Sequence, residues 1–173
     1  MIEIERTFLA KELPSDLADY TSNEMIDVYI PKDAPHPVLR LRKKGSTYEL
    51  TKKEVIVEND HSQFREQTII LTESEFNALF SQIEGKKLHK IRYEYPLPNG
   101  TAEIDVFQGA LQGLVLVDVE FTSVDAKDTF AMPDFCLVDV TQSDFIAGGM
   151  LCGKSYVDIV EELAHFGYKL IHS

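Results

Sequence analysis

The chain has 173 residues, 44% of them hydrophobic and 27% charged, the size and composition of a single globular domain covering residues 1–173. Its formal net charge of -12 argues against a non-specific nucleic-acid binder, because such proteins carry a basic surface. We expect neither a signal peptide nor a membrane span, since no apolar run approaches the ~20 residues that cross a bilayer. Two cysteines, Cys136 and Cys152, fit neither a disulfide framework nor a zinc knuckle and favour a reducing cytoplasm.

Apolar and polar residues alternate with period two along most of the chain, a pattern typical of β-strands. The pattern predicts strands over residues 2–9, 25–30, 38–44, 47–55, 64–71, 89–96, 101–107 and 114–122, with a ninth candidate over 135–140. The sequence Pro98-Asn-Gly100 predicts a tight hairpin. Residues 54–63 are polar, and we expect them to form a mobile loop.

Two segments have the residue spacing of helices. Thr72 and Glu75 form a capping box, in which each side chain can satisfy a backbone donor of the other. At helical spacing they are followed by Phe76, Leu79, Phe80 and Ile83. A second helix is predicted over residues 155–165, ended by Gly167, with an apolar face of Val157, Val160, Leu163 and Ala164. Many strands and few helices indicate a β-rich α+β domain.

The polar positions of six predicted strands carry charged residues, and these are sorted by sign. Three strands carry paired carboxylates, at Glu3 and Glu5, Glu103 and Asp105, and Asp118 and Glu120. Three other strands carry basic residues, at Arg40 and Arg42, Lys53, and Lys90 and Arg92. For one strand taken alone, the ordinary interpretation is a face exposed to water.

For the whole set, an enclosed site explains the sorting better. Like charges two residues apart on one strand face repel each other, so a surface that serves only solubility would mix the signs. Carboxylate oxygens suit Mg²⁺ or Mn²⁺, and guanidinium groups suit phosphate oxygens. A β-barrel closed around the charged faces would hold a polyanion and its metal ions inside, with the apolar faces packed outward against helices.

The same residues resemble the motifs of the CYTH superfamily, also known as triphosphate tunnel metalloenzymes. The N-terminal ExExK signature is similar to the segment Glu3-Ile-Glu-Arg-Thr-Phe-Leu9. The later motifs resemble, in the family's order, residues 39–45, 48–53, 90–92, 103–107, 116–120, 140–141 and 154–156. Each motif alone is weak, but the ordered set is specific and spans nearly the whole chain.

The resemblance implies a closed eight-stranded antiparallel β-barrel with flanking helices, in which Mg²⁺ or Mn²⁺ assists the hydrolysis of triphosphates. It implies metal ligands at Glu3, Glu5 and Glu120, with Glu103, Asp105 and Asp118 holding a second ion or its waters. It implies a phosphate clamp of Arg40, Arg42, Lys53, Lys90 and Arg92, and it makes Glu5 and Tyr29 the catalytic candidates. Glu66 is a further candidate for the acidic set.

The chain departs from the signature at one position, where Thr7 replaces the lysine of ExExK. Some members pair that lysine with a tyrosine of the following strand, and Tyr29 lies where this tyrosine would fall. A tyrosine with a pKa near its ordinary value of about 10 is a poor base at neutral pH. Three alternatives remain: another lysine substitutes, a metal-bound water is the nucleophile, or the protein binds triphosphates with little turnover.

Two patterns are not expected to mark sites. Residues 148–155, Gly-Gly-Met-Leu-Cys-Gly-Lys-Ser, fit the Walker A pattern, but no buried strand precedes them and only eighteen residues follow. We expect a glycine-rich turn there, before a helix capped by Ser155. The five histidines show no metal-binding spacing, and we expect most of them on the surface.

Three functions fit these expectations, led by metal-dependent hydrolysis of inorganic, nucleoside or thiamine triphosphate. The second is adenylate cyclisation, which uses the same clamp on ATP. The third is a triphosphate or polyphosphate binding module without catalysis, suggested by Thr7. The expected partner is therefore a small-molecule triphosphate, with no nucleic acid and no membrane, and the protein is expected to be a monomer or a homodimer.

Overall fold

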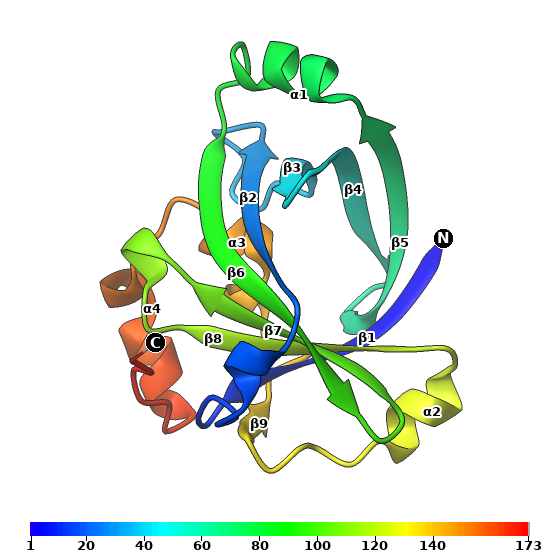
Figure 1. Ribbon diagram of the computed structural model, residues 1–173, viewed down its shortest axis with the longest axis vertical. Helices are drawn as coiled ribbons and strands as arrows, with labels where there is room; N and C mark the ends of the chain where they lie inside the picture. Colours follow the sequence, from blue (N-terminus) through cyan, green and yellow to red (C-terminus); the bar gives the residue numbers. More distant parts are fainter. Residues whose placement is uncertain (173) are drawn as a thin grey trace.

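An antiparallel sheet of nine strands closes on itself in the computed structural model, which describes residues 1–172 (Figure 1). The strands lie in the order β5-β4-β3-β2-β6-β7-β8-β1-β9, and β1 also pairs with β5. Eight strands therefore form a closed barrel, and β9 pairs with the C-terminal end of β1, beyond the residues that pair with β5. The predicted α+β class and eight-stranded antiparallel barrel are confirmed. The strands are β1 (Ile2–Ala10), β2 (Ser22–Ile30), β3 (Leu39–Lys44), β4 (Thr47–Val57), β5 (Asp60–Leu71), β6 (Lys86–Leu97), β7 (Gly100–Phe107), β8 (Val115–Phe121) and β9 (Cys136–Asp139).

All nine predicted strands exist, but the predicted mobile loop over residues 54–63 is wrong. Those residues extend β4 and β5 into a long hairpin, in which Val55 pairs with Phe64 and Val57 with Asp60. Asn59 turns the chain with a φ of 64°, a left-handed conformation that asparagine tolerates well. The β-branched residues Val55, Ile56 and Val57 favour a strand at the start of a stretch whose polar composition suggested a loop.

Four α-helices among residues 1–172 lie outside the barrel: α1 (Glu73–Phe80), α2 (Val124–Thr129), α3 (Gly148–Leu151) and α4 (Tyr156–His165). The predicted capping box at α1 is confirmed, because the Thr72 N–H donates to Glu75 Oε2 at 2.7 Å and the Glu75 N–H donates to Thr72 Oγ1. No helix among the described residues has the length and apolar character needed to cross a membrane.

Helix α4 confirms the predicted segment, but of the predicted apolar face only Leu163 is buried. Val157 is 78% exposed and Val160 is 40% exposed, whereas Ile159 and Leu163 are fully buried. Ile159 and Leu163 are four residues apart and so lie on one side of the helix, which is the side that packs against the barrel. The helix ends as predicted, with Gly167 at a φ of 72°.

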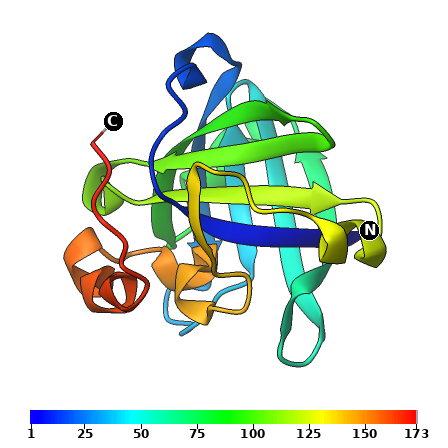
Figure 2. The same ribbon diagram turned by 90° about the horizontal axis from the view of Figure 1, so that it is seen from below.

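The hydrophobic core lies largely between the barrel wall and the elements around it. Under α1, Phe76 packs on Val28 and Leu41, which point away from the barrel axis. Helices α3 and α4 cover a second apolar cluster, and Figure 2 shows α3 beside the loop that joins β2 and β3. Because the apolar strand faces are buried outward, the charged faces are left to line the interior.

Candidate functional site

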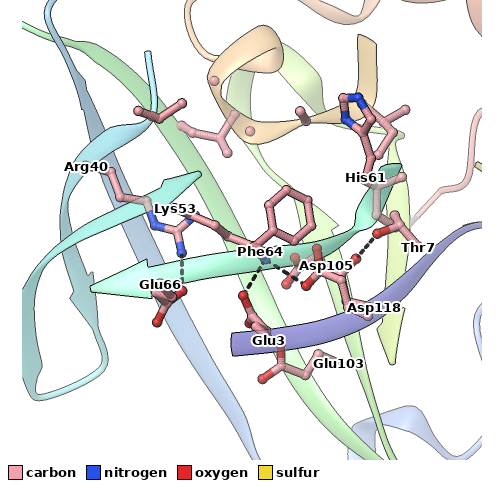
Figure 3. Close-up of a pocket in the computed structure, with 18 of the residues that line it drawn as sticks. Glu3, Thr7, Arg40, Lys53, His61, Phe64, Glu66, Glu103, Asp105 and Asp118 are labelled. Atoms are coloured by element: carbon pink, nitrogen blue, oxygen red, sulfur yellow. Dashed lines mark hydrogen bonds and ion pairs between the residues drawn. The ribbon is translucent and has the colours of Figure 1, made fainter. Parts of the chain in front are cut away.

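The interior of the barrel is a charged cavity of about 320 Å³ (Figure 3). Every site residue predicted from the sequence lines it: Glu3, Glu5, Tyr29, Arg40, Arg42, Lys53, Lys90, Arg92, Glu103, Asp105, Asp118 and Glu120. Thr7 and Glu66 line it as well. Residues from opposite ends of the sequence thus share one enclosed site.

The order of the strands separates the charges into two walls. The acidic strands β7, β8 and β1 are consecutive neighbours in the barrel. The basic strands β4, β3 and β6 form the rest of the circumference together with β2 and β5. Acidic and basic strands therefore approach each other at two seams: the first lies where β5 separates β1 from β4, and the second where β6 pairs with β7.

Carboxylates crowd together on the acidic wall. Glu5 and Glu120 are directly opposite each other on β1 and β8. Burial raises the pKa of Glu5 to about 7, with further upward pressure from Asp118 and Glu3 and partial relief from Lys53. Burial also raises the pKa of Glu120 to about 7, and the charges of Glu3 and Glu103 add to it. Burial and mutual repulsion therefore leave Glu5 and Glu120 partly protonated near neutral pH.

Lys53 joins the walls at the first seam. Its Nζ lies 2.7 Å from Glu5 Oε2 and 2.8 Å from Glu3 Oε2. Burial pushes the pKa of Glu3 upward, but Lys53 outweighs it and holds that pKa below its ordinary value. The buried Glu3 Oε2 nevertheless accepts no hydrogen bond, since the ammonium is near it but not aligned with it. Figure 3 shows Lys53 reaching across the cavity toward Glu3.

Asp105 is the centre of the second seam. Arg92 donates to it through Nε and Nη2, both at 2.6 Å, and Lys90 pairs with the same carboxylate. Arg92 also pairs with Glu103 and, at 3.2 Å, with Asp118. Burial works against ionisation of Asp105, but Arg92 and Lys90 hold its pKa at about 2. This carboxylate is therefore ionised and already fully engaged.

The two arginines of β3 differ in how they are held. Arg42 donates to Asp27 on β2 through Nε at 2.6 Å and Nη2 at 2.7 Å. Arg40 has only distant partners, with Tyr29 Oη at 3.4 Å and Glu66 Oε2 at 3.8 Å, and its buried Nε has none. Arg40 therefore has more unused hydrogen-bonding capacity than Arg42.

Thr7 occupies the place of the signature lysine without replacing its charge. Its hydroxyl donates to Asp118 Oδ1 at 2.8 Å, and its backbone N–H donates to Thr141 Oγ1 at 3.1 Å (Figure 3). The side chain is 7% exposed. Thr7 thus binds one carboxylate of the acidic wall by a neutral hydrogen bond and leaves that wall more negative than a lysine would.

Tyr29 is buried at one end of the cavity. Burial raises its pKa above the ordinary value even though Arg40 lies nearby, so the phenol is neutral and available as a hydrogen-bond donor. Gly148 packs on it so closely that a Cβ at this position would lie 2.0 Å from Tyr29 Oη. A Cβ at Gly149 would lie 2.2 Å from the carbonyl oxygen of Pro37. The segment with the Walker A pattern therefore forms an end wall of the cavity, and its two glycines permit that contact.

Sequence reasoning missed several residues of this region. Asp27 was not predicted, although it shares the alternation of Tyr29 and so had to point to the same side of β2. The expectation that most of the histidines lie on the surface is confirmed, since all but the half-buried His61 are exposed, but the sequence did not predict that His36 and His61 line the cavity. The loop before β3 and the hairpin of β4 and β5 place them there, and neither position follows from local sequence.

Comparisons with known proteins agree with this geometry. No protein-family model matches the chain. An inorganic triphosphatase from Nitrosomonas europaea is 35% identical over 143 residues, which cover 82% of this chain and 91% of that protein. The crystal structure of the inorganic triphosphatase NE1496 is 32% identical, with a TM-score of 0.62 over 87% of this chain and 93% of the other. The structure of the PH1012 protein from Pyrococcus horikoshii is 18% identical, with a TM-score of 0.52 over 96% and 91%, and shows the fold alone.

Proposed function

Because the chain belongs to the CYTH superfamily of triphosphate tunnel enzymes, we propose that it hydrolyses a triphosphate to phosphate and diphosphate. Inorganic triphosphate is the leading substrate, since the relative from Nitrosomonas europaea is an inorganic triphosphatase. The observation that carries the proposal is the single cavity with an acidic wall opposite a basic wall. That arrangement suits a polyanion held on one side by cationic side chains and on the other by carboxylate-bound metal ions.

The basic wall supplies the phosphate clamp. Arg40 is its central member, because its guanidinium faces the cavity with an unpartnered Nε and no close counterion. Lys53 and Arg92 stand at the two seams, where each is already paired with carboxylates. Phosphate oxygens would replace those carboxylates as partners of the cations, and the released carboxylates would be free to hold the metal ions that accompany the polyanion.

The acidic wall fits a divalent cation. The side chains that would hold it are Glu3, Glu5 and Glu120, whose oxygens are the donors that Mg²⁺ or Mn²⁺ prefers. The raised pKa values of Glu5 and Glu120, each about 7, and the unsatisfied Glu3 Oε2 are what such a cluster shows without a metal charge. Among residues 1–172 no three potential ligands already converge as a metal site, so Lys53 must yield its place between Glu3 and Glu5. The ion would neutralise phosphate charge and lower the pKa of a bound water.

The protein's own groups supply the remaining chemistry. Glu5 is also the catalytic candidate: its pKa of about 7 holds without the ion, and as a ligand of the ion its carboxylate would help to position the attacking water. Tyr29 is neutral and serves as a hydrogen-bond donor rather than a base. Arg40 lies next to Tyr29 Oη and orients the phosphate chain beside it. Under this proposal Thr7 has no catalytic task beyond holding Asp118.

Metal binding is expected to release protons. Because the pKa values of Glu5 and Glu120 are raised to about 7 in the folded protein, both carboxyls must lose protons before they can bind a cation. A glutamate has a pKa of about 4.3 in the unfolded chain. When folding raises that pKa, the folded protein loses stability as the pH rises from the unfolded pKa to the folded pKa. Mg²⁺ should therefore raise the melting temperature more at about pH 8 than at about pH 5.5.

Calorimetric titration with Mg²⁺ in two buffers of different ionisation enthalpy measures the protons released. The double variant Glu5→Gln with Glu120→Gln is the control and should show neither Mg²⁺ stabilisation nor its pH dependence. Equal Mg²⁺ stabilisation at both pH values, without proton release, would show that these carboxylates do not form the metal site.

The decisive test is a substrate panel. Purified protein with Mg²⁺ or Mn²⁺ should release phosphate from inorganic triphosphate faster than from ATP or thiamine triphosphate. Formation of cyclic AMP and diphosphate from ATP would instead identify an adenylate cyclase. Tight triphosphate binding with no product from any substrate, between neutral and alkaline pH, would identify a binding module.

A further inference from the structure

Asp27 is an acidic residue in the middle of the basic wall. It lies on β2, between β3 with its arginines and β6 with Lys90, and its side chain is 1% exposed. Arg42, Arg40 and Lys90 all lie close enough to hold its pKa below the ordinary value, although burial acts in the opposite direction. Asp27 does not line the cavity, whereas Arg42, directly opposite it on β3, does. The carboxylate is therefore behind the arginine and cannot itself reach a ligand in the cavity.

The contact between the two side chains fixes one edge of the guanidinium. Arg42 Nε donates to Asp27 Oδ1 at 2.6 Å and Arg42 Nη2 donates to Oδ2 at 2.7 Å, a parallel pair of hydrogen bonds. The remaining nitrogen, Nη1, has no closer charged partner than Glu49 Oε1, at 3.8 Å. One edge of the planar group is thus taken up by Asp27, and Nη1 at the opposite corner is left for the cavity.

We propose that Asp27 is a positioning residue for substrate binding: it locks Arg42 so that Nη1 presents its hydrogen-bond donors to a phosphate group. This role rests on the proposed function, because it assumes that the basic wall binds the phosphates of a triphosphate. Asp27 has two opposing effects on an anion in the cavity. Its negative charge weakens the attraction of the basic wall for an anion. Its hydrogen bonds to Arg42 restrict the arginine before binding, so that less side-chain entropy is lost when a phosphate binds. Positioning is the larger effect, since Arg42 is aimed by two short charge-assisted hydrogen bonds.

Asp27→Asn shows which of the two effects is larger, because loss of the charge should strengthen anion binding and loss of the positioning should weaken it. Asparagine keeps the shape of aspartate, but its amide nitrogen would face an N–H of Arg42, so only one of the two hydrogen bonds can form. We expect KM for inorganic triphosphate, and Kd for it measured by calorimetry, to rise about tenfold with kcat changed less than about threefold. A KM equal to the wild-type value, or tighter binding as expected from the lost negative charge alone, would overturn the proposal.

Val28→Ala is the matched control, because Val28 is the next residue of β2 and is buried on the opposite face against Leu41 and Phe76. It should lower the melting temperature while leaving KM unchanged, which is the result that a purely structural role of Asp27 would also give. Arg42→Lys serves if Asp27→Asn does not fold, since lysine keeps the charge and loses the paired contact. This variant should raise KM as Asp27→Asn does, and a wild-type KM would overturn the proposal.

The outcome remains interpretable if the protein does not turn over triphosphates. Absence of activity in the wild type would contradict the proposed function, and Asp27 would then be judged from triphosphate binding alone. Wild-type affinity in Asp27→Asn would contradict the positioning role, whatever the reaction. The two failures are therefore distinguishable.

Discussion

Arg40→Ala should lower kcat/KM for inorganic triphosphate by about 10²–10³-fold, the loss typical for a buried donor aimed at developing charge. Of the two arginines of β3, Arg40 makes fewer close hydrogen bonds within the protein. Most of its N–H donors are therefore available to a bound phosphate. The same change should not reduce stability appreciably. A buried charge with weak partners is costly to the folded state, and removing it also removes that cost.

Steady-state phosphate release tests the expected loss of kcat/KM, and urea denaturation of the same preparation tests the expected retention of stability. Arg65→Ala is the control, since Arg65 is an exposed residue of β5 that does not line the cavity. It removes the same charge from the protein and should leave kcat/KM near the wild-type value. Equal kcat/KM in the Arg40→Ala variant and the wild type would remove Arg40 from the phosphate clamp.

Asp105→Ala should lower the free energy of unfolding by about 3–5 kcal/mol, as expected when one partner of a buried ion pair is removed. Its carboxylate is 1% exposed and is the common partner of Arg92 and Lys90, so both cations would remain buried without it. Chemical denaturation measures the loss. Glu54→Ala is the control, because Glu54 forms a 2.8 Å ion pair with Lys52 that is nearly half exposed. Such a surface pair is expected to contribute less than about 1 kcal/mol.

The contribution of Asp105 should also depend on pH. Its pKa is about 2 in the folded protein, below the value of about 3.9 in unfolded chains. The stabilisation is therefore fully present above about pH 4 and is lost as the pH falls from there toward the folded pKa. In Asp105→Asn the acid-dependent part of the unfolding curve should be smaller over that window. An unchanged curve would mean that other carboxylates account for acid unfolding.

The pattern of residues predicted much of this protein. Alternation with period two identified all nine strands, because the side chains of a strand point to opposite faces whatever the strand pairs with. The same alternation placed Glu3 and Glu5 on one face and Arg40 and Arg42 on another. Once the apolar faces are buried under helices, the charged ones have only the interior to occupy.

Predictions from local sequence patterns were wrong in two segments whose structure depends on packing or strand pairing. Val157 and Val160 were predicted to share the buried face of α4 with Leu163, yet it is Ile159 that is buried beside Leu163. Residues 54–63 have the composition of a loop, yet they pair as a hairpin because Phe64 and Val55 continue the strands. The buried face of α4 is decided by contact with the distant barrel strands, whereas the hairpin is decided by the pairing of its own two arms.

The sequence by itself determined the strands and the sorting of their charged faces by sign, because strand alternation is a local property. Only the tertiary structure decided which charges meet. The strand order makes β7, β8 and β1 a continuous acidic wall, joins it to basic strands at two seams, and places Asp27 behind Arg42. Coulomb energies depend on separations of a few ångströms between residues far apart in the chain, and those separations are fixed by strand pairing.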